Sequence, residues 1–132
     1  MKFFQGVFFQ HIDKKSRIWY YNEDMIGKTV KVIIDRPLGS FHPEYKNLQY
    51  TVNYGYIPNT MAGDGEEQDA YVLGIDEPVK EFTGKVIAVI RRKNDVECKW
   101  VVAPKEKIYT KEDIRKAVYF QEQYFETEIE TR

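Results

Sequence analysis

The sequence has few of the side chains that most often hold soft metals or act as nucleophiles. Its 132 residues include one cysteine, Cys98, and two histidines. A single cysteine excludes both an internal disulfide and a metal site built from cysteines. Apolar residues make up 42% of the chain, but no run approaches the roughly 18 consecutive apolar residues that a membrane-spanning helix needs. The opening residues are too interrupted by polar side chains for a signal peptide, so we expect a cytoplasmic protein without membrane contact.

The chain also lacks a strong net charge. A formal value of −1 argues against a dedicated nucleic-acid binder, which is usually basic. The charges are unevenly distributed, because seven acids oppose a single base over residues 60–82, whereas five bases face two acids over residues 85–99. This order suits a site that binds metal cations together with an anionic substrate. Two oppositely charged surfaces would give the same pattern.

The length and the apolar pattern predict one domain over residues 1–132, built mainly from strands. Runs rich in aromatic and β-branched residues, bounded by turn residues, predict six or seven strands. These runs lie at 3–10, 16–21, 28–35, 47–58, 69–76, 84–93 and 98–104. Crowded short strands favour a closed or partly closed barrel, since closure removes exposed edges. The predicted fold class is therefore mainly β (α+β), with one C-terminal helix.

The C-terminal segment changes to a helical pattern. Thr110 and Asp113 have the spacing of a capping arrangement, which predicts a helix from Lys111 to about Glu128. The apolar residues that follow at helical spacing are Ile114, Ala117, Val118, Tyr124 and Phe125. We expect the apolar face formed by Ile114, Ala117 and Val118 to pack against the barrel.

An unusual density of acids lies in the segment "AGDGEEQDAYVLG", residues 62–74. Its carboxylates are Asp64, Glu66, Glu67 and Asp69. Like charges repel, so such a cluster is costly unless a cation neutralises it. The segment is therefore either a solvated loop or a cation site, and we expect Glu67 and Gln68 to lie on its surface.

Other acids lie at strand ends and extend this pattern. Asp35 ends the strand predicted at 28–35, and Asp95 and Glu97 lie where the chain turns back toward Cys98. On a barrel these ends are able to converge on one rim. Because side chains alternate along a strand, Cys98 should face away from Glu97 and Lys99 and serve in packing.

Four segments resemble motifs of the soluble family I inorganic pyrophosphatases. "NYGYIPNTMAGDGEEQDAYVLG" is similar to their central Asn-Tyr-Gly-aromatic stretch followed by an Asp-Gly-Asp-Pro-x-Asp signature. "NDVECKWVVAP" resembles their second acidic motif, "IIDRP" their early acidic strand, and "YFQEQYF" their aromatic-rich terminal helix. The central motif is the specific one, because its order and spacing match over more than ten residues. The resemblance covers about residues 30–125.

The resemblance implies an OB-like five-stranded barrel of the inorganic pyrophosphatase fold. It implies hydrolysis of pyrophosphate, or a related phosphoanhydride, by a water activated by Mg²⁺ or Mn²⁺. The metal ligands that it implies are Asp64, Glu66, Asp69, Asp95 and Glu97. The catalytic residues that it implies are Glu66 as the base, Lys99 and Tyr54 on the phosphate side, and Asp35 as the early acid. We further expect a homo-oligomer.

The chain departs from the family pattern mainly on the phosphate side. Glu66 and Glu97 replace aspartates, and the connection over residues 36–49 is shorter than in the family. The family places a lysine, a glutamate and an arginine in that region. The residues available here as substitutes, none at a matching position, are Arg36, His42, Glu44 and Lys46. We therefore expect weakened or altered activity.

A different class of function fits the same sequence. A non-catalytic barrel could bind a phosphorylated ligand, a nucleic acid or a protein partner and keep the acidic loop as a relic. Stacking aromatics for a nucleic acid are present, but acids clustered at the rim oppose a polyanion in the absence of a metal.

Overall fold

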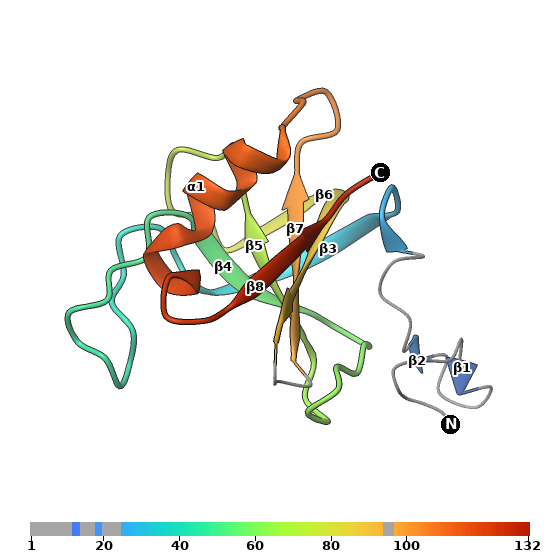
Figure 1. Cartoon of the computed structure of the whole chain (residues 1–132), viewed down its shortest axis with the longest axis horizontal. Coiled ribbons are helices and arrows are strands. Elements are labelled where there is room, and N and C mark those ends of the chain that lie inside the picture. The colour runs from blue at the N-terminus through green and yellow to red at the C-terminus, as the bar shows by residue number, and fades with distance from the viewer. Residues whose placement is uncertain (1–11, 14–17, 20–24, 94–96) are drawn as a thin grey trace.

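The computed structural model describes residues 12–13, 18–19, 25–93 and 97–132. The elements in chain order are β1 (Ile12–Asp13), β2 (Ile18–Trp19), β3 (Thr29–Arg36), β4 (Asn53–Ile57), β5 (Gln68–Val72), β6 (Glu81–Arg92), β7 (Cys98–Ala103), α1 (Lys111–Glu122) and β8 (Thr127–Glu130). The strand predicted at 3–10 lies outside the described residues. Strands β1 and β2 pair with each other as a separate two-stranded ribbon (Figure 1).

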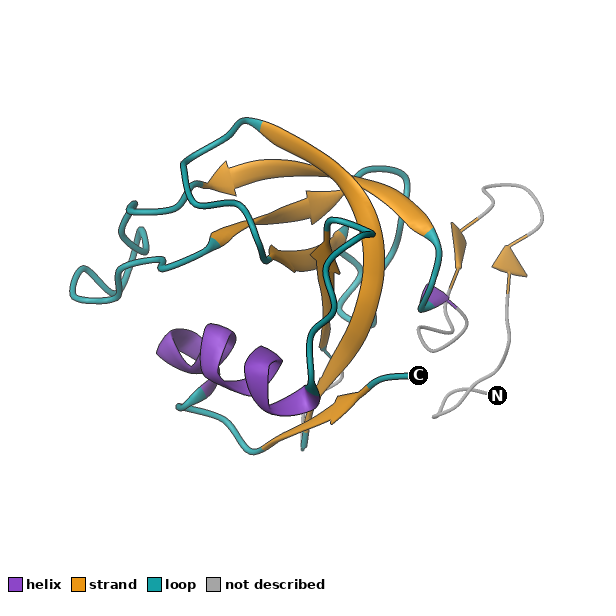
Figure 2. Ribbon diagram, turned by 90° about the horizontal axis from the view of Figure 1, so that it is seen from above, coloured by secondary structure: helices purple, strands orange, loops and turns teal. Residues whose placement is uncertain are grey.

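Five strands close into a barrel in the order β3-β4-β5-β7-β6, and β6 pairs back onto β3 (Figures 1 and 2). The β5–β7 pair is parallel and the other pairs are antiparallel. Strand β6 is 12 residues long, so its first part pairs with β3 while its second part pairs with β7 and β8. The predicted small β-barrel with a C-terminal helix is confirmed.

The barrel wall is buried on both of its faces at β7. Trp100 and Val102 pack in the interior with apolar residues from the other four barrel strands. Val101 and Ala103 point the opposite way and pack with Ile114 of α1. Successive side chains of β7 therefore belong to two different cores, one inside the barrel and one between the barrel and the helix. Burial on both faces explains why this strand reads as a continuous apolar run.

Helix α1 begins where the sequence predicts. The Thr110 hydroxyl accepts a hydrogen bond from the Asp113 backbone N–H at 3.0 Å, and the Asp113 carboxylate accepts one from the Thr110 N–H at 2.9 Å. These reciprocal bonds form the capping box. No helix in the described part of the chain is long and apolar enough to cross a membrane.

The predicted helix end at Glu128 is wrong, because α1 stops at Glu122. Residues 127–130 instead form β8, whose Ile129 pairs with Ile90 of β6 and joins the core under the helix. Pairing with β6 satisfies the backbone and covers the edge of that strand, and this outweighs the helical pattern. Tyr124, expected within the helix, belongs to the turn that follows, and its side chain is 69% exposed.

Substitution of Val118 tests the packing between helix and barrel. Val118 is 1% exposed and belongs to the core under α1, so Val118→Asp buries an unpaired charge. We expect the free energy of unfolding to fall by about 4 kcal/mol, measured by urea denaturation. The matched control is Lys116→Asp on the exposed face of the same helix, which should change it by no more than about 0.5 kcal/mol. An unchanged urea midpoint for Val118→Asp would contradict this packing.

Candidate active site

A pocket of about 640 Å³ lies on the helix-facing side of the barrel wall. Its lining comes from the barrel strands, from the 37–49 connection and from the C-terminal end of α1. Among the residues predicted for the site, the pocket brings together Asp35, Tyr54, Asp69, Glu97 and Lys99. Segments far apart in the sequence therefore meet here, as the barrel prediction requires.

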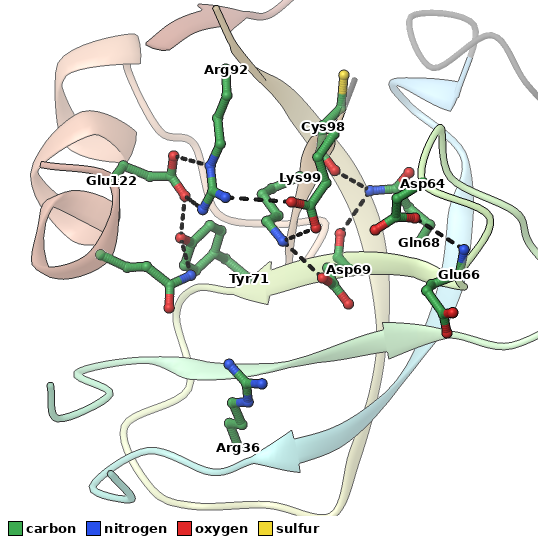
Figure 3. Close-up of polar contacts among 12 residues, drawn as sticks. Arg36, Asp64, Glu66, Gln68, Asp69, Tyr71, Arg92, Cys98, Lys99 and Glu122 are labelled. Carbon is green, nitrogen blue, oxygen red and sulfur yellow. Dashed lines mark hydrogen bonds and ion pairs between the residues drawn. The ribbon is translucent and has the colours of Figure 1, made fainter. Parts of the chain in front are cut away.

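Lys99 is a buried cation of this pocket and is 3% exposed. Its Nζ donates to Asp69 Oδ2 at 2.8 Å and to Glu97 Oε2 at 2.7 Å (Figure 3). The parallel pairing of Ala70 with Trp100 places the two preceding residues, Asp69 and Lys99, on the same face of the wall. One ammonium group thus lies between two carboxylates. Their mutual attraction offsets the free-energy cost of partly removing these three charges from water.

The buried amide of Gln68 fixes the strand ends that carry these groups. Its Nε2 donates to the backbone carbonyls of Asp69 at 2.9 Å and of Cys98 at 2.7 Å. The expectation that Gln68 lies on the loop surface is wrong, because its amide joins β5 to β7 where both strands begin. Cys98 packs against the interior core, as its alternation with Glu97 and Lys99 predicts.

Arg92 at the end of β6 joins the pocket to the helix. Its guanidinium donates to both carboxylate oxygens of Glu122, at 3.0 and 2.7 Å, and its Nη1 lies 3.5 Å from Glu97 Oε1. The Phe125 ring centroid lies 3.7 Å from its Cζ. Burial opposes the charged guanidinium, but the hydrogen bonds and charge of Glu122 outweigh it and raise the pKa of Arg92 well above its ordinary value.

A chain of hydrogen bonds continues from this ion pair through the core. The Tyr71 hydroxyl donates to Glu122 Oε2 at 2.5 Å and accepts from Gln121 Nε2 at 2.8 Å. The Tyr50 hydroxyl donates to Gln121 Oε1 at 2.7 Å and accepts from Arg36 Nη1 at 2.6 Å. Each polar side chain in this series of hydrogen bonds therefore has a partner, and the bonds hold the pocket wall in place.

Gln121 and Glu122 were not predicted for the site. Glu122 lies four residues after Val118 on the helix, and Gln121 three residues after it, so helical spacing places both near the buried face. Arg92 follows the buried Ile90 by two residues along a strand. A charged residue at a position that the pattern marks as buried is the sequence signal of an ion pair. That signal was present for Arg92 and Glu122.

Tyr54 on β4 contributes a neutral hydroxyl to the pocket. Its ring centroid lies 5.6 Å from Lys99 Nζ. Burial raises the pKa of Tyr54 well above its ordinary value, and the nearby negative charge of Asp69 adds to the increase. The hydroxyl therefore keeps its proton at neutral pH and is able to donate it in a hydrogen bond.

Asp35 lies on the pocket rim at the end of β3. Desolvation of the part that faces the pocket raises the pKa of its carboxyl above the usual 3.8, although the residue as a whole is exposed. The adjacent Arg36 lowers this pKa, whereas the negative charge of Asp69 raises it. A carboxyl of this kind takes up a proton more readily than an ordinary aspartate does.

The acidic loop lies apart from the pocket lining. Asp64 and Glu66 are both exposed, and the Asp64 carboxylate accepts a hydrogen bond from the Glu66 backbone N–H at 3.0 Å (Figure 3). Neither side chain lines the pocket, and Asp95 lies outside the described residues. Within the described ranges, no three acidic, histidine or cysteine side chains are grouped so as to hold a metal ion.

The donor set in the pocket does not fit Mg²⁺ in this arrangement. Mg²⁺ prefers hard oxygen ligands in near-octahedral geometry. The two predicted metal ligands that do converge, Asp69 and Glu97, direct carboxylate oxygens at Lys99 Nζ. The ammonium group therefore occupies the position between the carboxylates where a cation would be favoured. The predicted five-residue metal set stays a prediction.

A pH series on Asp35→Asn tests the raised pKa. Because the folded-state pKa lies above the unfolded one, the contribution of Asp35 to stability is fully present below about pH 3.8 and is lost as the pH rises through the raised value. Asparagine does not ionise, so the variant should gain stability relative to wild type as the pH rises above about 3.8, measured by urea midpoints. Asp76→Asn, on an exposed loop, is the control and should follow wild type. Parallel curves for Asp35→Asn and wild type would refute the shift.

Glu122→Gln tests whether the buried ion pair holds the helix end. The change leaves the Arg92 guanidinium with Glu97 as its remaining carboxylate, so unfolding should become easier by about 3 kcal/mol. The control is Glu112→Gln, which removes the exposed pair with Arg115 at 3.6 Å and should cost at most about 0.5 kcal/mol. The free energy of unfolding is measured with a denaturant. Equal effects of the two changes would show that the buried ion pair stabilises the fold no more than the exposed one.

Comparison with known proteins places this barrel and pocket in a family. The inorganic pyrophosphatase family matches residues 12–128, and the chain belongs to that family. An inorganic pyrophosphatase of Nostoc sp. is 40% identical over 65 residues, which cover 47% of this chain and 37% of the relative. One of Synechocystis sp. is 38% identical over 64 residues, covering 46% and 36%. The matched region thus spans little more than a third of these relatives.

Solved structures share the fold at lower identity. A crystal structure of the inorganic pyrophosphatase from Ehrlichia chaffeensis superposes with a TM-score of 0.62 at 22% identity, covering 80% of this chain and 87% of that one. A structure of the enzyme from Neisseria gonorrhoeae gives a TM-score of 0.58 at 21% identity, covering 74% of each chain. These structures confirm the barrel with its terminal helix.

Proposed function

We propose that this protein hydrolyses pyrophosphate, or a closely related phosphoanhydride, to phosphate by attack of water. The observation that carries the proposal is the Asp69–Lys99–Glu97 cluster in the pocket, because these residues come from the family's two acidic motifs. Membership of the inorganic pyrophosphatase family supports the same reaction. The proposal extends to a cytoplasmic location and a homo-oligomeric state.

The residues of the pocket supply charge and position. Phosphoryl transfer depends mainly on orientation and on neutralising charge on the oxygens of the reacting group. Lys99 provides a fixed positive charge, and the Tyr54 hydroxyl provides a hydrogen-bond donor. Asp35, with its raised pKa, is able to hold or release a proton at its carboxyl oxygen beside them.

Two carboxylates are candidates for the general base that accepts a proton from the attacking water. Glu66 is the residue that the family resemblance assigns, whereas Asp35 lines the pocket directly. Comparing turnover by Glu66→Gln and Asp35→Asn separates these assignments, because the true base should be the one whose amide variant loses turnover while still binding substrate.

The requirement for a divalent cation belongs to the proposal. When bound, Mg²⁺ or Mn²⁺ would neutralise charge on the phosphate oxygens. A cation between the pocket carboxylates would compete with the Lys99 ammonium group, which already contacts both of them. Assays without a cation, with Mg²⁺ and with Mn²⁺ measure the requirement directly.

Lys99→Ala tests the proposed reaction. Loss of the ammonium group should lower kcat/KM for pyrophosphate at least tenfold, about 1.4 kcal/mol of transition-state stabilisation. Phosphate release is measured from pyrophosphate, tripolyphosphate and nucleoside triphosphates, each under the three cation conditions. Lys105→Ala, exposed after β7, is the control and should keep wild-type kinetics. If wild type releases no phosphate above the buffer rate from any substrate, the enzyme proposal fails and a non-catalytic phosphate-binding barrel replaces it.

A further inference from the structure

The pocket has an aromatic half that hydrolysis of pyrophosphate does not use. Its lysine and its two arginines lie on barrel strands. The connection between β3 and β4 and the turn after α1 extend on the same side of the barrel (Figures 1 and 2), and both add aromatic or apolar side chains. These side chains, which form the aromatic half, are His42, Tyr45, Leu48, Tyr124 and Phe125. Pyrophosphate has no apolar surface to pack against them.

The volume of the pocket also exceeds what pyrophosphate fills. The pocket measures about 640 Å³. Volumes of roughly 300–1,000 Å³ are typical of sites for drug-sized ligands, and pyrophosphate is much smaller than such a ligand. The pocket therefore has room for a larger molecule that carries a phosphoanhydride at one end.

Three exposed aromatic side chains are grouped in the aromatic half. Tyr45 is 66% exposed, Tyr124 is 69% exposed and Phe125 is 43% exposed. In the described part of the chain six large hydrophobic side chains are exposed, and these three line one pocket. A single exposed apolar side chain is normal in a folded protein, but a group of them around a pocket marks a surface that contacts a ligand or a partner.

Tyr45 is held in position by the imidazole of His42. The His42 Nδ1 accepts hydrogen bonds from the backbone N–H groups of Glu44 at 3.0 Å and of Tyr45 at 3.2 Å. The centroids of the two rings lie 4.8 Å apart. The backbone that carries the exposed tyrosine ring is therefore fixed by the imidazole, and the ring itself contacts it.

Phe125 connects the aromatic half to the charged part of the pocket. Its backbone N–H donates to the Glu122 carbonyl at 3.0 Å, which fixes the turn after α1. Its ring centroid lies 3.7 Å from Arg92 Cζ, within the range of a cation–π contact. An exposed aromatic ring thus lies directly beside the ionic groups. This arrangement matches a ligand in which a planar ring and an anionic group belong to one molecule.

A nucleobase fits the aromatic half better than an aliphatic group does. Bases stack on aromatic side chains through their flat faces, with little dependence on which base it is. Asn47 lines the same pocket and comes from the same connection as Tyr45. Its amide both donates and accepts hydrogen bonds, as the polar edge of a base requires. An aliphatic group would leave this amide without a ligand contact.

We infer that the pocket binds a nucleoside polyphosphate, whose base packs against Tyr45 and Phe125 while its phosphoanhydride lies toward Lys99. Hydrolysis of that anhydride rests on the proposed function: water adds to a phosphorus atom, the bridging P–O bond breaks, and the two phosphate-bearing products leave with release of a proton. Recognition of the base rests on the aromatic half of the pocket and does not require turnover.

Calorimetry with three matched analogues tests this inference. Methylenediphosphonate carries a non-hydrolysable diphosphate group alone. Adenosine 5′-(α,β-methylene)diphosphate carries the same group on a nucleoside, and isopentyl methylenediphosphonate carries it on an aliphatic chain. The variants are Tyr45→Leu and Phe125→Leu, which remove a ring but keep an apolar side chain. The control is Tyr119→Leu, because Tyr119 is also exposed, at 59%, but lies on α1 outside the pocket lining.

We expect wild type to bind the adenosine analogue at least tenfold more tightly than either other analogue, because base stacking adds to the phosphate contacts. Tyr45→Leu and Phe125→Leu should each reduce the ratio of the Kd values of methylenediphosphonate and the adenosine analogue at least threefold. Tyr119→Leu should keep the wild-type ratio. Taking the ratio removes any change that Phe125→Leu causes at Arg92. Thermal midpoints confirm folding, and Tyr45→Leu decides the outcome if Phe125→Leu does not fold.

A ratio of one in wild type, a wild-type ratio in the folded variants, or equal binding of the isopentyl and adenosine analogues overturns the inference. Absence of binding by wild type also overturns it. In each case, phosphate release from pyrophosphate by wild type leaves the proposed function standing. If wild type releases no phosphate from any substrate but shows the expected ratios, the proposed function fails and recognition of the nucleoside holds.

Discussion

The fold and the pocket both depend on one line of buried and partly buried charges that runs from Asp69 through Lys99, Glu97 and Arg92 to Glu122. Each of these groups would be costly to bury alone, and each is tolerated because an opposite charge lies beside it. The line crosses from the barrel strands β5, β7 and β6 to the end of α1. The helix is therefore attached to the barrel by ionic contacts at one end and by apolar packing along its length.

The same line of charges shapes the chemistry that the pocket offers. Carboxylates that stabilise Lys99 and Arg92 also reduce the positive charge that these residues present to a ligand. Arg36, by contrast, is held by tyrosine rings and a hydroxyl. Arg36 therefore differs from Lys99 and Arg92 in the kind of partner that contacts it, although all three line a single pocket.

Local patterns predicted the barrel strands over 28–104 and the capped start of α1, because strand alternation and the capping box are encoded by neighbouring residues. Contacts between distant residues were not predictable in the same way. The end of α1 depends on pairing of residues 127–130 with β6, and the Tyr50–Gln121 hydrogen bond joins residues 71 positions apart. A β-bulge after Ile34 depends on how β3 meets β4. Family motifs pointed to Asp69, Glu97 and Lys99, but the placement of Asp64 and Glu66 depends on a loop conformation that no motif specifies.

Strand β6 has a consequence for how the chain folds. It pairs with β3, β7 and β8, so the barrel ring closes only when residues near 30 meet residues near 84, and the outer pairing needs residues near 130. Contacts of such long sequence separation make folding slow compared with that of a helical protein of the same size. During synthesis, β8 emerges after β6 and β7, and until it pairs, the second half of β6 has an uncovered edge that is open to pairing with another chain.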